Sequence, residues 1–357
     1  MWPTLLLALT LVVFTLPLLP ALIEWRRKDD VLPLKIVQTQ EGNVFYFADS
    51  FRTFIEGELH ALAHRRNTHE PSENYALVHE EGLFVPDAKE SRSRLINRIL
   101  IAMRPLHLPD NLSFPREVFA RQAVTTGSNN RFRAILAEGT LVLGRNTTVL
   151  RWAHGRNVQV GGRANLMGRL SAEESISLEP GCRFSRVHAP TISFGRDPWQ
   201  QSRAEQAATS TAGKVSRVLK VATDNAGRWL IDGDFTIPAY SAFQGDIIVH
   251  GSLRIERGTH ISGSIKTHGD LVLVSRCHVK GSMVSGGSII LGPDCTAGGP
   301  VVAEQRVDLH PGVVVGTLKK AATITAGEVR AESGVVVHGT VWARERGMTL
   351  PYSRKEG

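Results

Sequence analysis

Apolar and glycine positions repeat every eighteen residues in the second half of the chain. Four rows that start at Gly233 agree without a gap, so that Gly251, Gly269 and Gly287 share its column. Apolar residues separated by a single residue recur at fixed places in each row, which is typical of short β-strands and not of helices. Repeats that bury an apolar side only by stacking form solenoids. The pattern therefore predicts a mainly β protein built around a parallel β-helix.

The eighteen-residue row also predicts the geometry of one coil. At about 3.3 Å per residue the row gives a path of about 60 Å, or about 20 Å for each of three faces. Successive coils lie about 4.8 Å apart and are joined by parallel ladders of hydrogen bonds. The apolar columns are expected to point inward. The predicted core ladder consists of Leu253, Ile255, Ile261, Ile265, Leu271, Leu273, Val279, Met283, Ile289 and Leu291.

The same period is present, less regularly, earlier in the chain. Val158 stands eighteen residues before Ile176, and similar apolar pairs surround them. We therefore expect the first coils of the β-helix over residues 135–195. The next segment is polar and rich in Ala, Ser and Thr, a composition typical of a loop. The remaining predicted boundaries are a loop or linker over 196–228, the main β-helix over 229–345 and a polar tail over 346–357.

A small mixed α/β region is predicted over residues 26–134. Phe51, Ile55, Leu59 and Leu62 fall at helical spacing, and Asp49 is a suitable N-cap for that helix. The sequence contains no catalytic motif here, so we expect the region to bind a partner. The other predicted elements are strands over 35–40 and 43–47, a hairpin formed by 75–79 and 83–85, and a helix that starts near Asp87 and ends at Pro105.

An uncharged segment opens the chain. Residues 2–23 carry no charge, and a helix of that length would span about 33 Å, close to the thickness of a bilayer core. Basic residues follow this segment and none precedes it, which places the rest of the chain in the cytoplasm. We therefore predict a single-pass anchor over residues 1–25, with a cleaved signal peptide as the alternative. The predicted membrane-interface residues are Trp2, Trp25, Arg26, Arg27 and Lys28.

Composition narrows the choice of partners. The chain has 42 Lys and Arg against 34 Asp and Glu, and the net charge of +8 permits anionic lipid or nucleic acid. Basic residues of the coils, such as Arg254 and Lys266, alternate with acids such as Asp246 and Glu256, and aromatic residues that would stack on bases are missing around them. We therefore expect no dedicated nucleic-acid site. Three cysteines are too few for a disulfide scaffold or a four-thiolate zinc site.

Two histidine pairs and one cysteine pair also follow the period of eighteen. Two imidazoles are too few for a usual zinc site, and no carboxylate stands at matching spacing. We therefore predict exposed histidines, no catalytic or metal-binding residue and no cofactor. In the cytoplasm the cysteines are expected to stay reduced, as small side chains in a ladder. The pairs are His250 with His268, His260 with His278, and Cys277 with Cys295.

Over residues 245–343 the rows resemble the bactofilins, a family of polymer-forming bacterial cytoskeletal proteins. Gly251-Ser-Leu-Arg-Ile255 and Ile261-Ser-Gly-Ser-Ile265 are examples of the shared pattern. The resemblance implies a right-handed β-helix that polymerises end to end without nucleotide. It also implies filaments on the inner face of the inner membrane that position cell-envelope enzymes. The present chain departs from the family in its length, its predicted membrane span and its additional region.

An open end of a β-helix is itself a candidate site. Its edge presents unpaired N–H and C=O groups that are either capped or paired with another chain. We expect one self-association end near Val337, Val341 and Trp342. The alternative is that Trp342 packs under the C-terminal tail.

The predicted function is a membrane-anchored, self-associating scaffold that organises cell-envelope or polysaccharide-synthesis proteins at the cytoplasmic face of the membrane. Its partners would be other copies of itself, the inner membrane and an unknown cell-envelope protein. The alternative is an acyltransferase of the hexapeptide-repeat type, which also has eighteen-residue coils and would use a His as base. The uneven spacing of inward residues within each row favours the scaffold over the enzyme.

Overall fold

The computed structural model describes residues 2, 3, 6, 10, 16, 43–64, 74–78, 82–195, 217–218 and 228–352. The chain divides into two units, residues 1–43 and residues 44–357. Most of the predicted anchor, the predicted strand over 35–40 and most of the predicted loop or linker over 196–228 lie outside the described residues. Among the helices that the structure does describe, none is long and apolar enough to cross a membrane.

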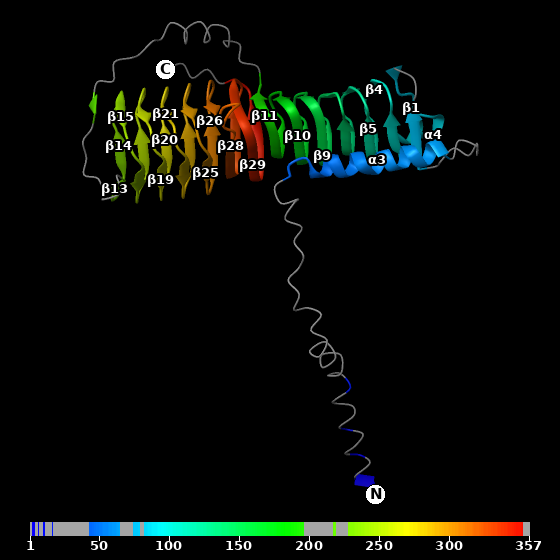
Figure 1. Cartoon of the computed structure of the whole chain (residues 1–357), viewed down its shortest axis with the longest axis horizontal. Helices are drawn as coiled ribbons and strands as arrows, with labels where there is room; N and C mark the ends of the chain where they lie inside the picture. Colours follow the sequence, from blue (N-terminus) through cyan, green and yellow to red (C-terminus); the bar gives the residue numbers. More distant parts are fainter. Residues whose placement is uncertain are drawn as a thin grey trace. The chain divides into compact units, whose positions relative to one another are not determined.

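The described strands of the second unit form a β-solenoid of about 12 turns, with about 18 residues per turn, as the rows predict (Figure 1). Within each half of the solenoid the strands of neighbouring turns pair in parallel. We call residues 75–194 the N-terminal half. Its strands are β1 (Tyr75–Val78), β2 (Gly82–Leu83), β3 (Ile99–Ala102), β4 (Leu106–Leu108), β5 (Ser113–Ala120), β6 (Val124–Thr126), β7 (Arg131–Ala137), β8 (Thr140–Leu143), β9 (Thr148–Val160), β10 (Asn165–Leu178) and β11 (Arg183–Phe194).

The C-terminal half comprises the strands from β12 to β29. Most of them are three residues long, with the outer two side chains buried and the middle one turned outward. These strands are β12 (Arg217–Val218), β13 (Trp229–Ile231), β14 (Phe235–Ile237), β15 (Ser241–Phe243), β16 (Ile247–Val249), β17 (Leu253–Ile255), β18 (His260–Ile261), β19 (Ile265–Thr267), β20 (Leu271–Leu273), β21 (His278–Val279), β22 (Met283–Ser285), β23 (Ile289–Leu291), β24 (Thr296–Ala297), β25 (Val301–Ala303), β26 (Arg306–Leu309), β27 (Val314–Val315), β28 (Ala322–Glu332) and β29 (Val335–Leu350).

The core is a stack of apolar ladders inside the solenoid. All ten residues of the predicted core ladder are at most 1% exposed. Leu253, Leu271 and Ile289 follow one another in register, as the rows predict. One glycine column is explained by close approach, because a Cβ on Gly263 would lie 1.9 Å from the carbonyl oxygen of Gly245. Packing between coils therefore fixes both the apolar and the glycine columns of the repeat.

The solenoid begins sixty residues earlier than the sequence pattern indicates. The small α/β region predicted over 26–134 does not exist as such, because β1 to β7 already form parallel coils from Tyr75 onward. Residues 75–78 and 82–83 are not a hairpin but two sides of one coil, paired with β3 and β4. The helix predicted from Asp87 to Pro105 stops at Ser93, and residues 99–102 are a strand.

Two helices accompany the N-terminal half. Helix α3 (Tyr46–His64) runs along the outside of the solenoid from β9 towards α4 (Figure 1). The strand predicted over 43–47 is wrong, since α3 starts at Tyr46; Asp49 therefore lies in its first turn and is not its N-cap. Helix α4 (Ala88–Ser93) has a capping box formed by Asp87 and Glu90.

Helix α3 packs on outward-facing apolar side chains, which explains the missed coils. Ile55 is fully buried, and Phe51 lies 5.5 Å from Trp152 between ring centroids. The strands beneath α3 are apolar on both sides, because one side faces the core and the other faces the helix. Such strands lose the alternation of apolar and polar residues that identifies a half-buried strand. The outer apolar side chains under α3 are Ile101, Phe119, Ala134, Leu136 and Trp152.

Candidate functional site: the junction and the free ends

The two halves of the solenoid meet at an antiparallel junction between β11 and β29. The pairing covers all three faces, with Arg183 opposite Met348, Val187 opposite Val341 and Ile192 opposite Val337. Figure 1 shows β29 and β11 side by side in the middle of the solenoid, although the two strands are far apart in sequence. Two series of coils that run in opposite directions are thus joined end to end within one chain.

The junction is closed by main-chain and side-chain hydrogen bonds. The amide of Cys182 donates to the hydroxyl of Thr349 at 2.8 Å, and the amide of Thr349 donates to the carbonyl of Cys182 at 2.9 Å. Gly347 allows this approach, because a Cβ there would lie 2.2 Å from the ring of Phe184. The chain therefore contains one complete example of two solenoid ends docking on each other.

The self-association end predicted at Val337, Val341 and Trp342 is not a free end. Strand β29 is paired with β28 on one side and with β11 on the other, and both valines are fully buried. Trp342 is 42% exposed on the outer surface, and the guanidinium of Arg186 lies 5.3 Å from its ring centroid. The sequence pattern could not reveal this pairing, because the partner strand lies in the other half of the chain.

The free ends of the solenoid lie at β13 and β14 and at β1 and β2. Within the described residues, each of these strands is paired on one side only. In β14 the amide of Phe235 donates to Ser252 and the carbonyl of Ile237 accepts from Glu256. Because main-chain groups alternate in direction along a strand, those of Thr236 point away from β17 towards the end of the solenoid.

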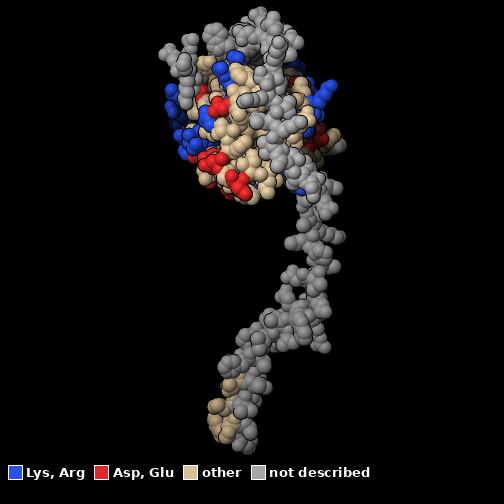
Figure 2. Space-filling view, turned by 90° about the vertical axis from the view of Figure 1, so that its left-hand side faces the viewer, with Lys and Arg blue, Asp and Glu red and all other residues tan. Residues whose placement is uncertain are grey.

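The surface at the β13 end is mostly uncharged at its centre. Figure 2 views the molecule from this side, and its charged side chains lie mainly around the margin. Leu230 of β13 is 59% exposed. At the opposite end Leu83 and Val85 are 63% and 76% exposed. Both ends thus combine unpaired strand edges with exposed apolar side chains, which is the arrangement that pairs with another chain.

A cluster of polar side chains lies where α3 begins, next to the junction. The ring of Phe45 lies 5.4 Å from that of His154 and 5.7 Å from that of His188. His154 is only 2% exposed in its side chain and shares a hydrogen bond of 2.9 Å with Ser171. Burial lowers the pKa of His154 and so favours its neutral form, although the nearby carboxylate of Glu173 opposes this effect. His154 thus lies next to the residues at which α3 begins.

The histidine pairs of the C-terminal half are stacked on its surface. The rings of His250 and His268 lie 5.0 Å apart between centroids, and those of His260 and His278 lie 5.9 Å apart. Asp232, eighteen residues before His250, contacts its ring at 2.7 Å, so the expectation that no carboxylate stands at matching spacing is wrong. Nowhere in the described part of the chain do three or more His, Cys, Asp or Glu side chains group as metal ligands would.

Cys277 and Cys295 stack in adjacent coils of the core. Both thiols are free and buried. A hydrogen bond between them lowers the pKa of Cys277 and raises that of Cys295, and burial raises the latter further. The eighteen-residue spacing of this cysteine pair is therefore explained by the stacking of the two side chains in the core ladder.

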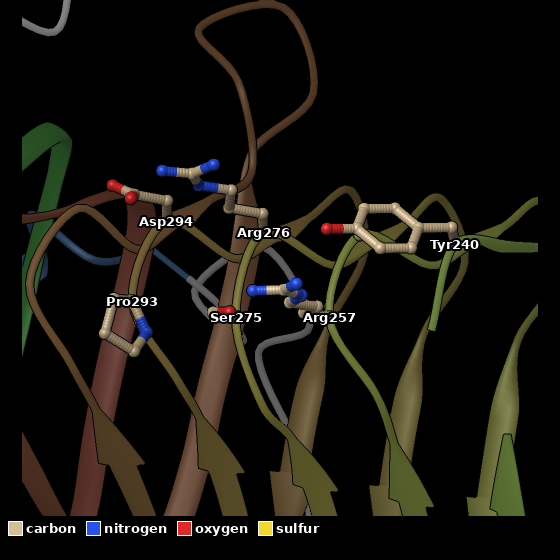
Figure 3. Close-up of a pocket in the computed structure, with 7 residues that line it drawn as sticks. Tyr240, Arg257, Ser275, Arg276, Pro293 and Asp294 are labelled. Atoms are coloured by element: carbon tan, nitrogen blue, oxygen red, sulfur yellow. The ribbon is translucent and has the colours of Figure 1, made fainter. Parts of the chain in front are cut away.

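A small hollow of about 270 Å³ lies on the turns of the C-terminal half (Figure 3). Tyr240 and Arg257 line one side of it, with the guanidinium 5.5 Å from the ring centroid. Ser275, Arg276 and Asp294 line the other side. Its side chains project from successive turns, and the hollow is too small to enclose an acyl-CoA-sized molecule.

The predicted membrane-interface residues receive little structural description. Trp2 is 87% exposed, whereas Trp25, Arg26, Arg27 and Lys28 lie outside the described residues. Comparison of the chain with protein-family models, with curated proteins and with solved structures finds no match.

Proposed function

We propose that this chain is a membrane-anchored scaffold that assembles through the ends of its β-solenoid. The β11–β29 junction carries the proposal, because it is an end-to-end contact between two stacks of coils in the same molecule. Among the described residues, β13, β14, β1 and β2 each pair on one side only and so offer ends for such a contact. The bactofilin-like rows of residues 245–343 agree with this proposal, and organisation of cell-envelope proteins would be the corresponding role.

The point at which the chain enters the solenoid supports a tethered scaffold. The carbonyl of Val44 accepts a hydrogen bond of 3.3 Å from Arg169, and Phe45 lies against His188 of β11. A membrane anchor over residues 2–23 would therefore be joined to the solenoid near its middle and not at either end. Confinement at a membrane raises the effective concentration of the ends, so weak contacts between them suffice for assembly.

The test is to block one end without disturbing the core. Thr236 is exposed, and its main-chain amide points towards the open end. Thr236→Pro removes this donor and is tolerated on an edge strand, whereas Thr236→Ala keeps the donor and serves as the matched control. We expect electron microscopy of the purified full chain in detergent to show end-to-end filaments for the wild type and Thr236→Ala, and short particles for Thr236→Pro.

Two results would contradict the proposal. The first is a wild-type chain that stays as single solenoids over a wide range of concentration and salt. The second is filaments of unchanged length in Thr236→Pro, which would place the contact elsewhere.

A further inference from the structure

One face of the solenoid runs through both halves. It is covered by a helix in the N-terminal half and by no described element in the C-terminal half. We call it the helix face, because α3 lies on it in the N-terminal half. Counting outward from the junction, the register within each half places seven outward residues on each side. At the junction itself His188 pairs with Thr340 and Trp342 pairs with Arg186, so the two rows are offset by two residues along the strands. In the N-terminal half the seven residues are His188, Ser171, His154, Leu136, Phe119, Ile101 and Leu77. In the C-terminal half they are Trp342, Thr325, Val302, Val284, Lys266, Ile248 and Leu230, and we call this row the bare strip.

The two rows correspond in character as well as in position. Leu136 and Val284 are both fourth from the junction, and Ile101 and Ile248 are both sixth. In the N-terminal half, α3 buries Leu136 and Ile101 completely. In the bare strip no described element lies over the corresponding positions, and Val284 and Val302 are each 36% exposed. An apolar row that needs a helix in one half is thus left open in the other.

Helix α3 also keeps aromatic side chains partly exposed. Tyr46 and Phe54 are 36% and 45% exposed, whereas Phe47, at 40%, lies against the guanidinium of Arg169 in its own solenoid. Phe54 is surrounded on the helix surface by the small residues Ser50, Thr53 and Gly57, one turn or less away, which leaves its ring open to a second surface.

We propose that a second copy of the chain covers the bare strip. Two copies would pack antiparallel with their helix faces together, so that α3 of each copy lies on the bare strip of the other. The proposal rests on the proposed self-association and adds a lateral contact to the contacts between ends. One of the two α3 helices would then lie at every point along the space between the solenoids. This space, about 10 Å wide, would be filled along its whole length.

The dimensions of the two surfaces agree. Helix α3 has 19 residues and is about 28 Å long, and seven strands at about 4.8 Å spacing extend over about 29 Å. Arg52 pairs with Glu138, next to β7, which is the fourth strand from the junction. In an antiparallel pair Phe54 would therefore lie near the fourth strand of the partner, which carries Val284. The combined face of about 60 by 12 Å gives roughly 700 Å² on each copy, the size of a standard interface.

The test measures the mass and the width of particles of the full chain in detergent. We expect pairs of solenoids in the wild type, and at least tenfold weaker pairing in Phe54→Ser and in the double variant Val284→Asp/Val302→Asp. The matched control is Val272→Asp/Ile290→Asp, which places two carboxylates at half-exposed outward positions of another face and should pair like the wild type.

The outcomes separate the lateral contact from the end contact. Filaments one solenoid wide, unchanged by the bare-strip substitutions, would overturn the lateral pairing and leave the end-to-end proposal standing. Paired short particles that persist in Thr236→Pro would support the lateral pairing alone. If vesicles of phosphatidylethanolamine and phosphatidylglycerol bind the wild type and not Val284→Asp/Val302→Asp, while no pairing occurs, a lipid surface covers the strip and the proposal is wrong.

Discussion

Leu271 illustrates how little freedom an inward position of the solenoid has. It is fully buried between Leu253 and Ile289, one coil away on either side. A carboxylate placed there would lose its water without gaining a partner. We expect Leu271→Asp to lose at least about 4 kcal/mol of unfolding free energy, enough to prevent folding of the coil. Thermal unfolding followed by circular dichroism measures the loss.

The neighbouring residue supplies the control for this prediction. Val272 lies in the same strand and points outward, half-exposed. Val272→Asp should therefore change the unfolding free energy by less than about 1 kcal/mol, as surface substitutions usually do. Equal losses in the two variants would show that strand propensity, and not inward burial, determines the eighteen-residue rows.

At the scale of elements, the docking of α3 depends on the neutral form of His154. Burial lowers the pKa of this imidazole, so the unfolded chain binds more protons than the folded chain below the ordinary histidine pKa of about 6.5. Glu173 and Asp49 favour the charged form, and Arg52 opposes it. The contribution of His154 to stability is therefore complete above about pH 6.5 and falls as the pH drops below that value.

The pH dependence can be assigned to this residue by substitution. Hydrogen exchange of residues 45–60 should become faster between pH 7.5 and pH 5, after correction for the intrinsic rates. His154→Asn should reduce this change, whereas His107→Asn, on an exposed outward position of β4, should leave it intact. An unaltered response in His154→Asn would assign the effect to another group.

Element by element, the sequence was informative where contacts are local or periodic. The spacing of Phe51, Ile55 and Leu59 predicted α3, because an amphipathic helix depends on neighbours three or four residues away. The rows predicted the coils from β14 to β25 for the same reason. The coils from β1 to β7 were missed, because α3 makes both sides of β3, β5 and β7 apolar and so removes the alternation.

The candidate site was harder to predict than the coils. The junction pairs Cys182 with Thr349 and Ile192 with Val337, and no period or motif connects residues so far apart. The C-terminal strand therefore looked like a free end. The true edge strands β13 and β14 are recognisable only after the order of the coils in space is known. Side-chain chemistry gave no signal, since edge pairing uses main-chain groups.

At the scale of the whole molecule, the junction makes two solenoids into one. The C-terminal half starts at its far end and returns coil by coil to β11, so the β11–β29 junction brings together residues as far apart in sequence as Cys182 and Thr349, which are 167 positions apart (Figure 1). Pairing between residues so far apart in sequence forms late in folding, after the local coils exist, because it requires closure of a long loop. Each half therefore has enough contacts of its own to form a separate stack of coils. Formation of the junction then couples the two stacks.

Gly347→Ala tests this coupling. The added Cβ would lie 2.2 Å from the ring of Phe184, which is itself buried and cannot move aside freely. We expect hydrogen exchange to become about tenfold faster or more at residues 183–194 and 335–349, while residues 247–303 keep their protection. The control is Gly57→Ala, where an added Cβ meets nothing within 4 Å. Because an opened junction exposes two further solenoid ends, Gly347→Ala should also associate at lower concentration than the wild type. Uniform loss of protection through both halves would instead mean that the solenoid unfolds as a single cooperative unit.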